Sequence, residues 1–74
     1  MTAARRETEM RETVQILSEL EEELDEKGNE CFARAKRYES TTLAYQLAFT
    51  HAEAYWESAR IIAHRRRVLV GLAS

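Results

Sequence analysis

The sequence predicts an all-α protein, either an antiparallel helical hairpin or a long coiled coil, that assembles into an oligomer. Apolar residues recur in alternating steps of four and three from Met10 to Val70, which is the repeat of packed helices. The 74 residues include no proline and only two glycines, and 45% are hydrophobic and 32% charged, a composition typical of long helices. No segment alternates with period two, so we predict no strand.

The chain is expected to form a single helical domain over residues 1–74, with two candidate positions for a turn. At 28–29, Gly28 can take a positive φ and Asn29 is a good N-cap residue, so we favour a turn there. At 40–42, three hydroxyl residues of modest helix propensity follow one another. The repeat runs through both positions, so one continuous helix is the third alternative.

Charge favours antiparallel packing for every turn position. Residues 19–26 hold six acids and no base, and a parallel dimer in register would set this segment against its own copy. A turn at Gly28 would lay these acids against residues 31–38. A turn near Thr41 would lay them beside residues 55–62 and bring Arg65 to Arg67 toward Glu12.

The chain is too short to gain much stability from a core of its own. A single core of this size supplies roughly 3–5 kcal/mol, and the lone Cys31 permits no internal disulfide. We therefore expect a homo-oligomer that also binds another protein. The predicted protein interface consists of large apolar residues of the helical repeat and its flank: Val14, Leu17, Leu24, Tyr45, Phe49, Trp56 and Ile62.

Nothing in the sequence predicts catalysis, a cofactor or a metal site. A helical di-metal site needs a glutamate three residues before each histidine, but Ala48 and Ile61 stand there before His51 and His64. Cys31 falls on the apolar repeat, where a buried structural cysteine is the favoured interpretation. We therefore expect a protein that is not an enzyme and carries no cofactor.

Two further features have both a structural and a functional interpretation. Glu21 and Arg66 interrupt the apolar repeat; they lie at the ends of the packed region or snorkel, or else they set the register. The candidate nucleic-acid contact is the arginine cluster near the C-terminus, although three of its members diverge by about 100° each around the helix. This cluster consists of Arg60, Arg65, Arg66 and Arg67.

Three stretches together resemble a known group of small proteins. They are VQILSELEEELDEKGNECFARAKRYE, AYQLAF and AYWESARIIAHRRRVLVGLAS. The chain is similar to small helical-hairpin proteins of unknown function from phage and prophage genomes, often encoded near recombination and replication genes. The resemblance implies a phage or prophage origin and no established activity. This sequence is shorter than that pattern, as if the connector between the helices were missing.

The expected function is non-enzymatic protein–protein interaction, by an oligomeric adaptor or regulator of a partner protein. The alternatives are a nucleic-acid-binding accessory protein that uses the arginine cluster, and a small structural component of a virion. No stretch approaches the ~18 apolar residues of a membrane span, and the N-terminus does not read as a secretory signal. We expect the protein in the cytoplasm, in the host cell if it is phage-encoded.

Overall fold

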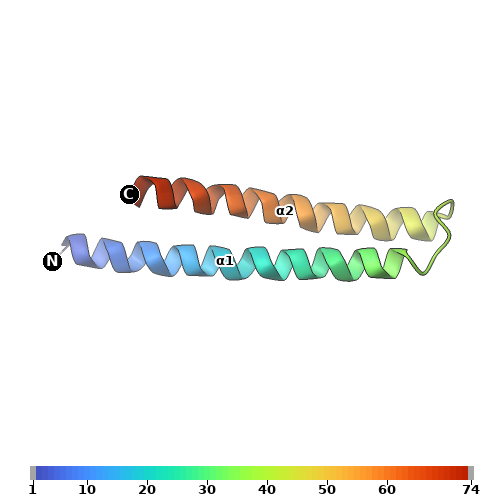
Figure 1. Ribbon diagram of the computed structural model, residues 1–74, viewed down its shortest axis with the longest axis horizontal. Helices are drawn as coiled ribbons and strands as arrows, with labels where there is room; N and C mark the ends of the chain where they lie inside the picture. The colour runs from blue at the N-terminus through green and yellow to red at the C-terminus, as the bar shows by residue number, and fades with distance from the viewer. Residues whose placement is uncertain (1, 74) are drawn as a thin grey trace.

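The computed structural model describes residues 2–73, with side chains from Ala4 to Leu72, and shows an antiparallel pair of long helices (Figure 1). Helix α1 spans Thr2–Ala35 and helix α2 spans Leu43–Ala73. The hairpin is an extended rod of 59 × 15 × 12 Å. The prediction of an all-α antiparallel helical hairpin is therefore confirmed.

The chain reverses direction over residues 36–42, and α1 continues without a break through Gly28. The favoured turn at 28–29 is therefore wrong, and so is a single continuous helix. The alternative position, 40–42, lies within the observed turn. Among the described residues no glycine takes a positive φ, so Gly28 is not used for conformational freedom.

Gly28 is needed for space, because the indole of Trp56 lies directly above it. A Cβ built on Gly28 would overlap Nε1 and Cδ1 of the Trp56 ring. Gly28 is buried, and the mid-helix position costs only about 1 kcal/mol of helix propensity relative to alanine. The glycine that suggested a turn therefore leaves the space that the Trp56 side chain of α2 occupies.

The hydroxyl residues that suggested the second turn position mark the start of α2. The Oγ1 atom of Thr42 accepts a hydrogen bond from the backbone N–H of Tyr45 at 3.2 Å and donates to the carbonyl of Glu39 at 2.7 Å. An N-cap hydroxyl of this kind satisfies one of the free donors in a first helical turn. Thr42 therefore begins α2 without help from glycine or proline.

Small residues on the seam let the two helices approach closely, and aromatic rings fill the end near the turn. Here the seam means the surface where α1 and α2 meet. Its fully buried side chains are alanines: Ala35, Ala52, Ala59 and Ala63. The Phe32 ring lies 5.6 Å from Trp56 and 5.9 Å from Phe49, between centroids, and the Lys36 ammonium sits 4.6 Å above Phe32.

The fit of Trp56 against Gly28 predicts that Gly28→Ala destabilises the hairpin. Overpacking a seam costs about 1–3 kcal/mol, which exceeds the roughly 1 kcal/mol that alanine gains in helix propensity. Urea unfolding followed by circular dichroism should show a lower midpoint for Gly28→Ala at equal protein concentration.

The matched control is Gly71→Ala, because a Cβ on Gly71 of α2 meets no atom within 4 Å. Its midpoint should be unchanged or slightly higher. A Gly28→Ala variant as stable as the original chain would show that Trp56 does not depend on this space.

Candidate interaction surface

The residues predicted to form a protein interface lie in the seam between the helices of one chain. Each is half-buried. The aromatic members Tyr45, Phe49 and Trp56 come from the half of α2 nearest the turn, and the apolar side chain of Ile62 flanks the seam farther along. The α1 members are Val14, Leu17 and Leu24. Contact of these residues with another protein stays a prediction.

The two polar residues of the apolar repeat face each other across the seam. A guanidinium nitrogen of Arg66 lies 2.9 Å from Oε2 of Glu21, with the two side chains 33% and 23% exposed. A second nitrogen of Arg66 donates to Oγ of Ser18 at 3.3 Å. Sliding one helix along the other would separate these groups, so the geometry supports the register-setting interpretation. The predicted approach of the arginines to Glu12 is replaced by this pairing with Glu21.

The outer side of α2 carries a second apolar row that α1 does not cover. At about 100° per residue, the step from Ala52 to Ile61 turns the side chain to the opposite side of the helix; Ala52 is 0% exposed and Ile61 58%. The outer stripe, as we name this row, consists of Leu43 (69% exposed), Leu47 (56%), Ala54, Ile61, Val68 (47%) and Leu72 (75%).

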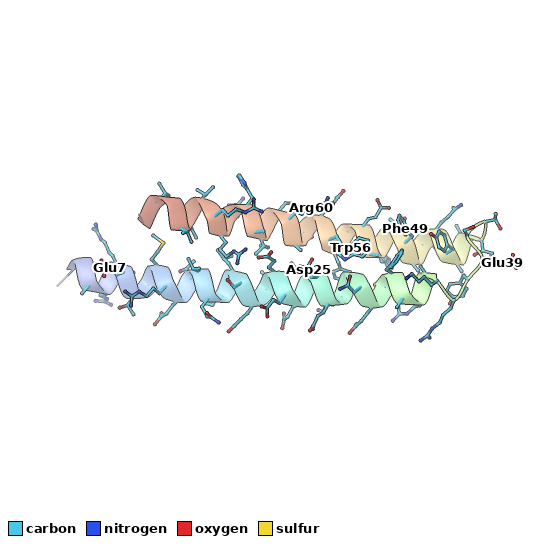
Figure 2. The ribbon with its side chains drawn as sticks, in the orientation of Figure 1. Glu7, Asp25, Glu39, Phe49, Trp56 and Arg60 are labelled. Carbon is cyan, nitrogen blue, oxygen red and sulfur yellow. The ribbon has the colours of Figure 1, made fainter. Side chains whose placement is uncertain are left out.

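The outer side of α1 has a different character. Its exposed residues include Glu19, Glu22, Glu26 and Asn29, and the side chains that point away from α2 end mostly in oxygen or nitrogen (Figure 2). Ile16 is the largest exception, at 62% exposed. The hairpin therefore has one charged flank and one apolar flank.

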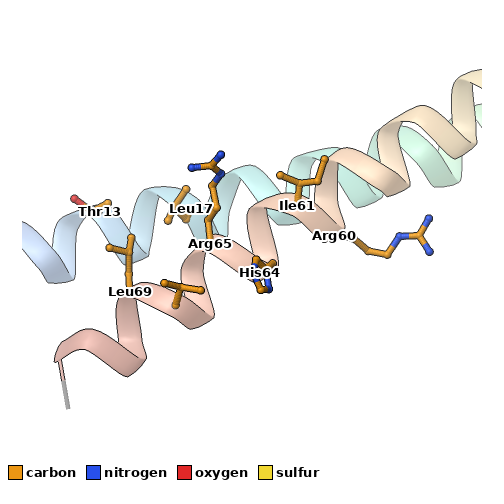
Figure 3. Close-up of a pocket in the computed structure, with 8 residues that line it drawn as sticks. Thr13, Leu17, Arg60, Ile61, His64, Arg65 and Leu69 are labelled. Carbon is orange, nitrogen blue, oxygen red and sulfur yellow. The ribbon is translucent and has the colours of Figure 1, made fainter.

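An open groove of about 760 Å³ adjoins the outer stripe near the free ends of the helices (Figure 3). Ile61 and Val68 belong to both the groove and the stripe, so the two features adjoin each other. Thr13 and Leu17 of α1 line the far wall. The remaining lining residues are Arg60, His64, Arg65 and Leu69.

The candidate nucleic-acid arginines do not gather into one patch. Arg66 is engaged with Glu21 in the seam, while Arg60 and Arg65 extend from the edge of the groove in different directions (Figure 3). Arg67 is exposed. Contact with nucleic acid through these residues stays a prediction, and the arrangement gives it no further support.

Sequence reasoning missed the outer stripe and Phe32. Leu47, Ala54, Ile61 and Val68 recur at the same heptad interval as the seam, so the signal was a second repeat in another phase. The apolar repeat passes through Cys31, so its neighbour Phe32 was not predicted to face the other helix. Both omissions came from tracing a single face of each helix.

Within residues 2–73 the structure contains no cluster of three or more side chains arranged to hold a metal ion. Over the same range, neither helix is long and apolar enough to cross a membrane. Cys31 is half-buried on the seam side of α1.

The fold and its surface define a two-helix antiparallel hairpin with an uncovered apolar flank. Comparison with known proteins does not assign the chain to a family, because it matches no family model, no curated protein and no solved structure.

The Glu21–Arg66 pair predicts that charge reversal at either residue destabilises the hairpin and that the double reversal restores it. Glu21→Arg and Arg66→Glu each place like charges at two positions whose side chains now form an ion pair. Because both side chains are partly exposed, we expect a coupling free energy of about 0.2–1 kcal/mol from a double-mutant cycle in urea.

The control cycle uses Arg5 and Glu9, an ion pair within α1 at 3.5 Å whose side chains are 83% and 64% exposed. Its coupling should be smaller and more easily removed by salt. Additive effects at Glu21 and Arg66 would contradict a register-setting role for this pair.

Proposed function

We propose that this protein acts by non-enzymatic protein–protein interaction, as an oligomeric adaptor or regulator that docks another protein surface on the outer stripe of α2. The observation that supports the proposal most directly is the exposure of that stripe. Its five large apolar side chains are between 47% and 75% exposed along one side of a single helix. Large apolar side chains exposed along one side of a helix, here interleaved with the exposed polar residues Thr50, Glu57 and Arg65, are a feature of interaction sites on soluble proteins.

The energetic argument is that water contact with this surface is unfavourable. Burial gains roughly 25 cal/mol per Å² of apolar surface, so covering a stripe that runs nearly the length of α2 provides a driving force for association. The seam cannot supply this cover, because α1 already occupies the opposite side of α2. The stripe therefore favours a partner that lies along the helix.

The shape of the stripe favours a helical partner. Its residues repeat at the heptad interval, which matches a second helix laid alongside. Arg60 and Arg65 stand at the edge of the adjoining groove, where they favour acidic groups on the partner and disfavour basic ones. An amphipathic helix with acidic flanks is therefore the kind of surface that this flank would accept.

The proposal predicts site-specific crosslinking from the outer stripe. Replacing Leu47 or Ile61 by a photoreactive phenylalanine analogue, in the cells that make the protein, should give covalent protein adducts on illumination. Denaturing gels and mass spectrometry would detect the adducts and identify their composition.

The matched control places the same analogue at Ala33, which is exposed on the charged outer side of α1. Few or no adducts should form there. If Leu47 and Ile61 give no more adducts than Ala33, the stripe does not contact protein and the proposed function is wrong.

A further inference from the structure

The outer stripe is arranged symmetrically about a point near the middle of α2. The midpoint between Glu57 and Ser58 is equally distant from Ala54 and Ile61, from Leu47 and Val68, and from Leu43 and Leu72. When a second α2 is laid antiparallel about this midpoint, every member of the stripe therefore meets another member of the stripe.

We propose that the outer stripe binds a second copy of this chain, with the two α2 helices antiparallel about a two-fold axis between Glu57 and Ser58. This inference rests on the proposed function and names the occupant of the same surface. A surface that pairs with itself about a two-fold axis is the isologous interface of a closed dimer.

Side-chain size supports the antiparallel arrangement. Ala54 of one chain lies opposite the larger Ile61 of the other, so small and large residues interlock at two symmetric positions. A parallel pair in register would set Ala54 against Ala54 and Ile61 against Ile61. That arrangement would leave a gap between the two Ala54 side chains and crowd the two Ile61 side chains.

Charge complementarity points the same way. In the antiparallel pair, Arg60 and Arg65 of one chain lie opposite residues 50–55 of the other. That segment holds Glu53 and no lysine or arginine. A parallel pair in register would instead set Arg60 and Arg65 beside the same residues of the second copy, and like charges at an interface disfavour that orientation.

Sedimentation equilibrium of the full chain tests the assembly. We expect a mass of twice the 8.6 kDa chain at micromolar concentration. Ile61→Glu should halve this mass while circular dichroism shows that the helices remain, because Ile61 lies outside the seam. Ala33→Glu, an exposed substitution of the same charge on α1, should leave the dimer intact.

Engineered cysteines test the orientation, in a Cys31→Ala background. Leu47→Cys and Val68→Cys should each give no disulfide-linked dimer when oxidised alone, because identical positions lie about 30 Å apart in the antiparallel pair. An equal mixture of the two variants should form the mixed disulfide, since these positions face each other within disulfide reach.

Three outcomes would overturn the inference. They are a monomeric mass at micromolar concentration, a Leu47→Cys disulfide with itself as in a parallel pair, and an oligomer without the mixed disulfide. Crosslinking of the stripe only to a different protein in cells would leave the proposed function standing and remove the second copy as occupant. Absence of stripe adducts altogether would remove both.

Discussion

Close approach of the two helices is the constraint on which the rest of this structure depends. Ala52, Ala59 and Ala63 of α2 face α1 with side chains too small to hold the backbones apart. Trp56 then has room only where α1 offers no side chain, at Gly28. The largest residue of the seam therefore determines which turn of α1 it must meet, and this contact sets the register.

The Glu21–Arg66 pair is a second, independent contact that fixes the same alignment of the helices, nearer their free ends. Its ion pair and the hydrogen bond to Ser18 form only when the helices are aligned as the Trp56 contact requires. The aromatic cluster lies near the turn, so packing and polar contacts specify alignment at different levels of the rod. Among residues 4–72 the buried hydrophobic side chains are alanines and the larger seam residues stay partly exposed, which makes such specific contacts important.

Helix α2 carries apolar residues on two sides. One side is used within the chain, and the other, from Leu43 to Leu72, is left in water. A helix that is apolar on opposite sides is suited to the middle of a larger assembly, whereas the acidic outer side of α1 is suited to its surface. The two helices thus differ in the chemistry of their outer sides.

Much of the fold could be predicted from the sequence, because helical periodicity is a local property that composition and spacing reveal. Seam positions such as Leu17, Gly28 and Trp56 followed from the repeat, and antiparallel packing followed from the acids of residues 19–26. The candidate surface could not be recognised in the same way. The sequence shows two apolar rows in α2 but not which of them packs against α1. Only the position of α1 shows which row is exposed.

The sequence by itself determined that the chain is helical, and its charges favoured antiparallel packing and its repeat indicated most of the side chains that meet in the seam. Only the tertiary structure decided where the chain turns and what Gly28 does. A glycine is compatible with a turn and also with close packing, and local sequence does not distinguish these uses. The choice depends on Trp56, which is distant in sequence and meets Gly28 only when α2 has folded back along α1.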